Sequence, residues 1–71
     1  MNDDEPEEYR LLREKLRELQ QEHADLDASI EALSHMPIPD QLMIARLKRR
    51  KLALRDEIVK IEDRILPDII A

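Results

Sequence analysis

Two ladders of apolar residues, with steps that alternate between three and four, run along most of this chain on either side of a Pro-Ile-Pro segment. A 3-4 repeat that continues over several heptads places its members on one stripe of a long α-helix. Each ladder therefore predicts one helix with a single apolar seam. The first ladder is Tyr9, Leu12, Leu16, Leu19, His23, Leu26, Ile30 and Leu33, and the second is Ile44, Leu47, Lys51, Leu54, Ile58, Ile61 and Ile65.

Prolines set the expected limits of these helices. A residue before proline is disfavoured in helical geometry, so the Pro-Ile-Pro segment ends the first helix, and Asp40 is a good N-cap for the second. Two helices of nearly equal length joined by a short stiff corner are expected to lie antiparallel. The expected segments are an acidic flexible tail at 1–6, a first helix at about 7–33, a proline-rich turn at 34–39, a second helix at about 40–66 and a short apolar tail at 67–71.

The register of the two helices can be checked against the turn. An antiparallel coiled coil places the a residue of one helix beside the d residue of the other. Pairing Leu33 with Ile44 and continuing along both ladders brings Leu16 beside Ile61, and every such pair has its midpoint at the Pro-Ile-Pro corner. We therefore predict an all-α, antiparallel two-helix coiled-coil hairpin. An open dimer that exchanges helices between two chains keeps the same layers and is the alternative.

Charge complementarity supports the same register. Charged residues make up 41% of the chain, and the basic stretch 46–55 falls opposite the acidic stretch 22–31. Exposed ion pairs contribute only about 0.2–1 kcal/mol each, so they select orientation more than they add stability. The expected pairs at the e positions are Arg13 with Glu62 and Asp27 with Lys48.

Two polar residues, His23 and Lys51, interrupt the ladders in adjacent layers. Polar residues at a positions commonly fix the register, and a lysine can extend its ammonium outward, here toward Asp27. We interpret His23, Asp27, Lys48 and Lys51 as a polar core set that keeps the helices aligned. A pH-sensitive role for His23 is a further hypothesis. No metal site is expected, because His23 and Asp27 alone do not complete a coordination shell.

The second helix carries two candidate contact surfaces. A 71-residue hairpin buries only a thin core, so further burial is needed. We therefore expect the protein to form a homo-oligomer, a dimer or higher, through a second apolar stripe at the b positions, with a protein partner as a further option. That stripe comprises Ala45, Leu52, Val59 and Leu66, and the candidate anion-binding residues beside it are Arg46, Arg49 and Arg50.

Composition argues against several classes of protein. The chain has no Cys and no Gly, so it has neither a thiolate site nor a glycine-rich phosphate loop, and we expect no enzyme activity, no catalytic residues and no cofactor. A net charge of −5 argues against a general nucleic-acid or anionic-membrane binder. The acidic start is unlike a signal peptide, and no apolar run reaches the roughly 20 residues of a membrane span. We expect a cytoplasmic protein with no membrane partner.

Two segments carry a resemblance to a known family. The stretch from His23 to Ile30 reads His-x-x-Leu-Asp-x-x-Ile, and the stretch from Leu47 to Ile58 reads Leu-Lys-(basic)-x-Lys-Leu-x-Leu-(basic)-Asp-Glu-Ile, with Asp40 between them. This pattern resembles the YdcH-like family of small bacterial proteins, a domain of unknown function. The resemblance implies a short helical hairpin in the bacterial cytoplasm, and it brings no agreed activity, cofactor or catalytic residue.

The predicted function is that of a non-enzymatic coiled-coil interaction or adaptor protein. The alternative is a small nucleic-acid-associated regulator that uses the basic outer face of the second helix. The working surface of the adaptor would be either the apolar stripe or the basic outer face of Arg46, Arg49 and Arg50, and the nucleic-acid alternative uses that same basic face.

Overall fold

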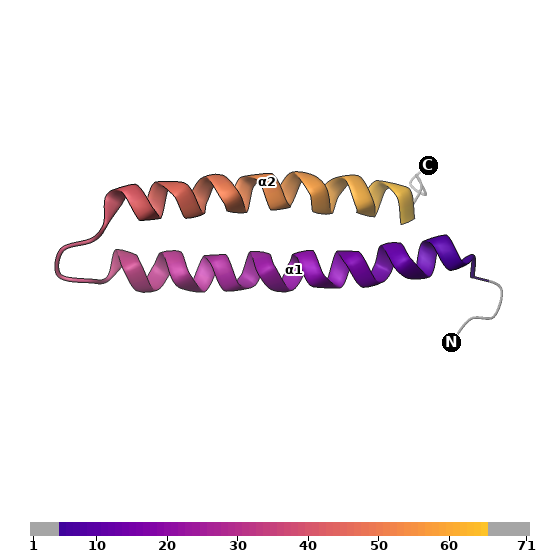
Figure 1. The fold of residues 1–71 in the computed structure, drawn as a ribbon, viewed down its shortest axis with the longest axis horizontal. Coiled ribbons are helices and arrows are strands. Elements are labelled where there is room, and N and C mark those ends of the chain that lie inside the picture. The colour runs from indigo at the N-terminus through magenta and orange to yellow at the C-terminus, as the bar shows by residue number, and fades with distance from the viewer. Residues whose placement is uncertain (1–4, 66–71) are drawn as a thin grey trace, which may run out of the picture.

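The computed structural model is a helical hairpin, and it describes residues 5–65 (Figure 1). Helix α1 spans Glu7–Ser34 and helix α2 spans Gln41–Ile65. The two helices run antiparallel and side by side, joined by one short loop, so that the start of α1 and the end of α2 lie at the same end of the hairpin. The prediction of an all-α antiparallel hairpin is confirmed, and it closes within a single chain.

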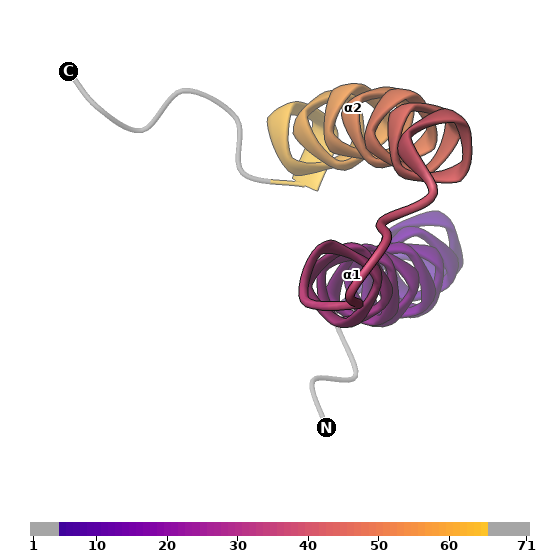
Figure 2. The ribbon, with the colours of Figure 1, turned by 90° about the vertical axis from the view of Figure 1, so that its left-hand side faces the viewer.

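The apolar seam between the helices is the core of the molecule. All fifteen members of the two ladders are buried or half-buried, whereas most of the other described residues are exposed. Four apolar residues within 5–65 are buried, and one of them, Leu54, has no exposed surface at all. Viewed along the hairpin axis, each helix is covered on one side only, by the other helix (Figure 2). These four buried residues are Leu19, Ile30, Ile44 and Leu54.

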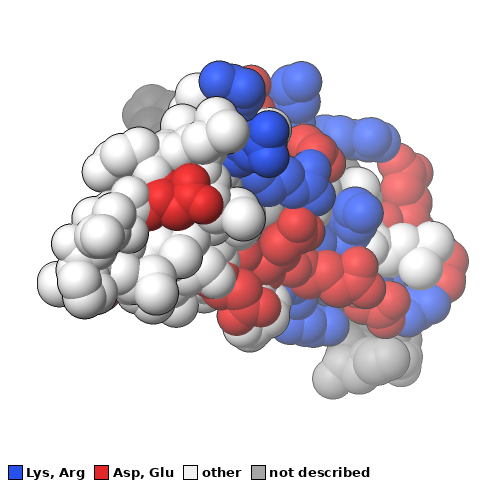
Figure 3. All heavy atoms as spheres, turned by 60° about the vertical axis from the view of Figure 1, so that its left-hand side comes forward, with Lys and Arg blue, Asp and Glu red and all other residues white. Residues whose placement is uncertain are grey.

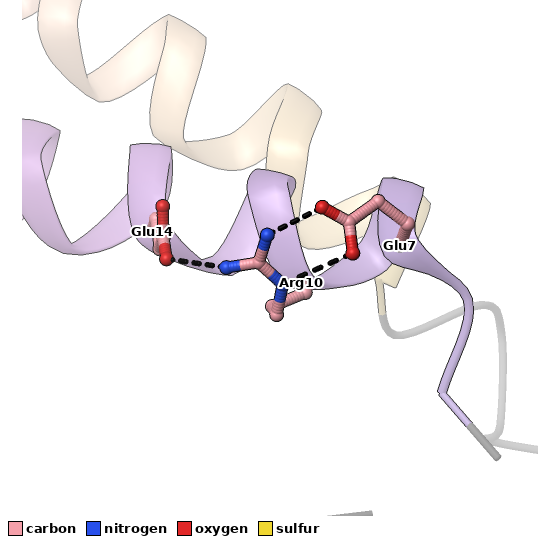
Figure 4. Close-up of polar contacts among 3 residues, drawn as sticks. All are labelled: Glu7, Arg10 and Glu14. Atoms are coloured by element: carbon pink, nitrogen blue, oxygen red, sulfur yellow. Dashed lines mark hydrogen bonds and ion pairs between the residues drawn. The ribbon is translucent and has the colours of Figure 1, made fainter. Parts of the chain in front are cut away.

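Helix α1 begins at a proline and is reinforced by charge. The carbonyl of Pro6 accepts hydrogen bonds from the backbone N–H groups of Tyr9 (3.0 Å) and Arg10 (3.2 Å). The Arg10 guanidinium donates to Glu7 one turn back and to Glu14 one turn ahead, at 2.8 Å for the latter (Figure 4). The hydrogen bond from Arg10 holds the pKa of Glu7 below its usual value, and Glu7 in turn raises the pKa of Arg10. A carboxylate in the first turn also complements the helix dipole.

The corner closes α1 with local hydrogen bonds rather than with glycine. The Ser34 hydroxyl donates to the Ile30 carbonyl at 2.7 Å, and the backbone N–H of His35 is directed at the carbonyls of Glu31 and Ala32. His35 has φ −93° and ψ 3°, so no left-handed residue is used. These contacts satisfy helix-end carbonyls that would otherwise lack partners.

Asp40 starts α2, as its side chain predicts. Its Oδ1 accepts the backbone N–H of Met43 at 3.0 Å, and its carbonyl accepts the N–H of Ile44 at the same distance. The helices were expected at about 7–33 and 40–66. Leu66 and the apolar tail 67–71 lie outside the described residues, as do the first four residues of the acidic tail.

Truncation of the seam is expected to destabilise the hairpin strongly. Leu54→Ala should lower the free energy of unfolding by about 2–5 kcal/mol, because it removes a fully buried side chain. Leu11→Ala truncates a leucine that is 51% exposed and should change this free energy by less than about 0.5 kcal/mol. Urea unfolding followed by circular dichroism measures both, and equal losses would contradict the position of Leu54 in the core.

Candidate functional site

A groove of about 480 Å³ lies along the seam near the middle of the two helices. It contains all four residues of the predicted polar core set and two further residues of α2. One of these, Leu52, belongs to the predicted apolar stripe; the other, Arg55, was not predicted as a site residue. Arg55 follows Lys51 by four positions, and this spacing is the signal that places it on the same face. The residues of this polar groove are His23, Asp27, Lys48, Lys51, Leu52 and Arg55.

Lys51 occupies an a position of the seam, but its ammonium group lies outside the seam at the surface. Its side chain is 36% exposed, and its ammonium donates a hydrogen bond to Asp27 on α1, whose side chain is 53% exposed. The aliphatic stem thus lies along the apolar seam while the charged end remains at the surface. The hydrogen bond from Lys51 lowers the pKa of Asp27, and the charges of Lys51 and His23 act in the same direction.

His23 lies beside this pair and is less exposed, at 23% of its side chain. Its Nδ1 is 3.9 Å from Oδ2 of Asp27, which is an ion-pair distance and too long for a hydrogen bond. Asp27 therefore has a cation from α2 on one oxygen and an imidazole from its own helix near the other. The arrangement couples the two helices where the apolar seam is interrupted.

The ion pairs expected at the e positions are wrong. Asp27 is paired with Lys51, and Arg13 is paired with Glu5. Lys51 is the better partner for Asp27 because it leaves the seam directly beside it. Side-chain reach, rather than heptad position alone, selects the partner.

Two other ion pairs join the helices along the g positions. Arg50 contacts Glu22 through Nε at 3.1 Å and Nη2 at 2.9 Å, and Arg64 contacts Glu8 at 2.8 Å. The two pairs lie two heptads apart on each helix. In both pairs the midpoint between the two residue numbers falls in the loop that joins the helices. They therefore support the predicted register, although each exposed pair adds only about 0.2–1 kcal/mol.

The basic outer face of α2 has few intramolecular partners. Of the three predicted anion-binding residues, Arg50 is engaged by Glu22, whereas Arg46 and Arg49 form no ion pair within residues 5–65. The same is true of Lys48 and Arg55 in the polar groove. Next to the corner, Figure 3 shows basic residues gathered beside a band of acidic ones. Much of the positive charge of α2 is thus available for contacts outside the hairpin.

The predicted apolar stripe is exposed on α2. Leu52 is 67% exposed and Val59 45%, and Ala45 is also exposed. Leu66, the fourth predicted member, lies outside the described residues. We refer to Ala45, Leu52 and Val59 as the α2 stripe.

The tip of the hairpin forms an apolar surface that the sequence analysis missed. Residues 32–45 contain one formally charged residue, Asp40, in a chain with 41% charged residues. In Figure 3 the tip is accordingly an almost continuous uncharged surface. The low local charge is the signal that identifies it. Its exposed large apolar residues are Met36, Ile38, Leu42 and Met43.

Residues 5–65 contain neither a cluster of metal-binding side chains nor a membrane-spanning helix. In this part of the chain no group of three or more His, Cys, Asp or Glu residues is arranged to hold a metal ion. Neither of the two described helices is long and apolar enough to cross a membrane.

The contribution of Asp27 to stability is expected to depend on pH. Its lowered pKa means that the native state binds the proton less tightly than the unfolded chain. The stabilisation is therefore present above the usual carboxyl range and is lost as the pH falls through the native pKa. Thermal unfolding should show Asp27→Asn less stable than the wild type at neutral pH, with the difference vanishing in acid. Glu18→Gln, at an exposed carboxylate of the same helix, is the control; a pH-independent difference would contradict the role of Asp27.

Comparison with curated proteins and with solved structures gave no match. One family matches, described as "Protein of unknown function (DUF465)", over residues 16–62. The matched range contains the corner, the polar groove, the α2 stripe and most of the seam. The YdcH-like small helical proteins, which the sequence resembles, are included in this family. The chain therefore belongs to the DUF465 family.

Proposed function

We propose that this protein is a non-enzymatic interaction module that self-associates through the α2 stripe. The single observation that carries the proposal is the exposure of Leu52 and Val59, one heptad apart on a helix whose other face already covers the seam. A second apolar stripe at this regular spacing gives α2 two faces that can pack against other helices. Exposed apolar residues that are rimmed by charged ones are typical of interaction sites on soluble proteins.

The size of the core supports the same proposal. Within residues 5–65 only four apolar residues, Leu19, Ile30, Ile44 and Leu54, are classed as buried. A core of this size is small for a chain of 71 residues, so burial of a further apolar face is expected to add stability.

The polar groove supports a structural role in preference to catalysis. Its one carboxylate, Asp27, is held by Lys51 and flanked by His23. A general base needs a free carboxylate or imidazole directed at a substrate, and this carboxylate is instead tied to the opposite helix. We therefore propose that the groove aligns the helices and that the protein acts by binding, in the cytoplasm of a bacterial cell.

The basic outer face of α2 favours one second candidate, a nucleic-acid-associated role. Four cations of this helix, Arg46, Lys48, Arg49 and Arg55, form no ion pair within residues 5–65. Two properties oppose this candidate: the net charge is −5, and the only aromatic residue, Tyr9, lies at the other end of the hairpin. Single-strand binding normally uses aromatic stacking platforms.

Self-association is tested by sedimentation velocity at micromolar concentration. The wild type is expected to be oligomeric, and Leu52→Glu/Val59→Glu is expected to be monomeric, because it places two carboxylates in the stripe. Leu11→Glu introduces the same chemistry at an exposed leucine of α1 and should leave the oligomer intact. Circular dichroism checks that all three proteins are helical. A wild type that is monomeric, or an oligomer that survives the double substitution, would contradict the proposal.

The second candidate is tested by binding to mixed RNA and DNA at several salt concentrations. If the basic face binds phosphates, Arg46→Ala/Arg49→Ala should weaken binding and reduce the slope of log K against log salt by about 1 for each lost contact. Lys15→Ala/Arg17→Ala removes two exposed cations of α1 as the matched control. Absence of binding at low salt, or equal losses in both variants, would remove this candidate.

A further inference from the structure

The charge of α2 reverses at the midpoint between Leu52 and Val59. The six charged residues from 46 to 55 are all basic, and four of the six from 56 to 65 are acidic. The change falls between Arg55 and Asp56, halfway between the two large members of the α2 stripe. The basic residues are Arg46, Lys48, Arg49, Arg50, Lys51 and Arg55, and the acidic ones are Asp56, Glu57, Glu62 and Asp63.

The reversal gives the two exposed apolar residues rims of opposite charge. On a helix surface, the neighbours of a residue are those three and four positions away on either side. Three of the four neighbours of Leu52 are cationic, and three of the four neighbours of Val59 are anionic. The cations around Leu52 are Lys48, Arg49 and Arg55, and the anions around Val59 are Asp56, Glu62 and Asp63.

We propose that the α2 stripe is covered by a second copy of this chain, packed antiparallel along α2 with a two-fold axis between Arg55 and Asp56. Leu52 of each copy then packs against Val59 of the other. This proposal rests on the self-association proposed above and specifies its geometry. The contact is isologous, so each interaction occurs twice.

Charge complementarity selects this arrangement. With the axis between Arg55 and Asp56, Lys48 of one copy faces Glu62 of the other, and Arg49 faces Asp63. These four side chains form no ion pair within residues 5–65, whereas Arg50 and Lys51 are already used inside the hairpin. The charges that remain are therefore those that a second copy can pair, which favours correct association over alternatives.

Other arrangements of the same two faces are less favourable. A parallel pair would place Leu52 on Leu52 and bring their cationic rims together. An antiparallel pair with its axis at Leu52 would bring Lys48 of one copy close to Arg55 of the other. Like charges in direct opposition disfavour an interface, so both arrangements are opposed by the cations around Leu52. In the proposed arrangement Arg55 faces Arg55 and Asp56 faces Asp56 at the centre, and these two like-charge contacts are outnumbered by the four opposite-charge contacts of Lys48 with Glu62 and of Arg49 with Asp63.

The geometry is tested by distances between spin labels on introduced cysteines, since the chain has no cysteine of its own. Residue 42 lies far from the proposed axis, and labels on Leu42→Cys should be separated by about 40 Å along the helix direction. Residue 53 lies near the axis, and labels on Ala53→Cys should be separated by only about 8 Å in that direction. Both positions are exposed on α2.

A charge exchange tests the register independently. Arg49→Asp and Asp63→Arg should each raise the dissociation constant of the dimer about three- to tenfold, because each creates two like-charge contacts. The double variant Arg49→Asp/Asp63→Arg should restore the wild-type value. The two residues are about 21 Å apart in one helix, so restoration within a single chain is not expected.

The outcomes separate this geometry from self-association in general. A short distance for both labels, or no restoration in the double variant, would overturn the antiparallel geometry while the α2 stripe remained the interface. A monomeric wild type would overturn both proposals. A dimer that is unaffected by Leu52→Glu/Val59→Glu would also overturn both.

Discussion

The burial of one apolar seam between two helices is the interaction on which this structure depends. Within residues 5–65 each helix packs only against the other, and most of the stability of such a helix comes from covering its apolar face. Leu54 and the three other buried residues make up the interior, so the register of the seam determines where every other side chain lies. The polar groove, the basic face and the stripe are positioned by it.

The charged residues of α2 form two groups, one that pairs with α1 inside the hairpin and one that lies on the outer surface. Inside the hairpin, the pairs made by Lys51, Arg50 and Arg64 link α2 to α1 and oppose slippage of the register. Outside it, the remaining charges of α2 surround Leu52 with cations and Val59 with anions. In the proposed dimer this second set selects the antiparallel arrangement, and the two apolar tips then lie at opposite ends of the assembly. Such a particle presents two identical uncharged surfaces far apart, as an adaptor requires.

The residues of the seam could be predicted from the sequence because the 3-4 spacing depends only on helix geometry. The role of Asp40 as the N-cap of α2 could be predicted because capping depends only on neighbouring residues. The contact of Lys51 with Asp27 was predicted from the reach of a lysine at a core position, whereas the pairs assigned from heptad positions alone, Asp27 with Lys48 and Arg13 with Glu62, were wrong because long side chains can reach several partners. The apolar tip was missed because Met36 and Ile38 were interpreted only as parts of a turn. Periodicity describes helices and gives no information about how a loop exposes its side chains.

The register of the seam is tested most directly by methyl NOEs in a sample labelled at leucine and isoleucine. The proposed register places the methyl groups of Leu16 beside those of Ile61, and their NOE is expected to persist when labelled protein is diluted into unlabelled protein, because both residues belong to one chain. An NOE from Leu16 to Leu54 instead, one heptad out of register, would contradict the account. So would an Ile61 NOE that disappears on dilution with unlabelled chains.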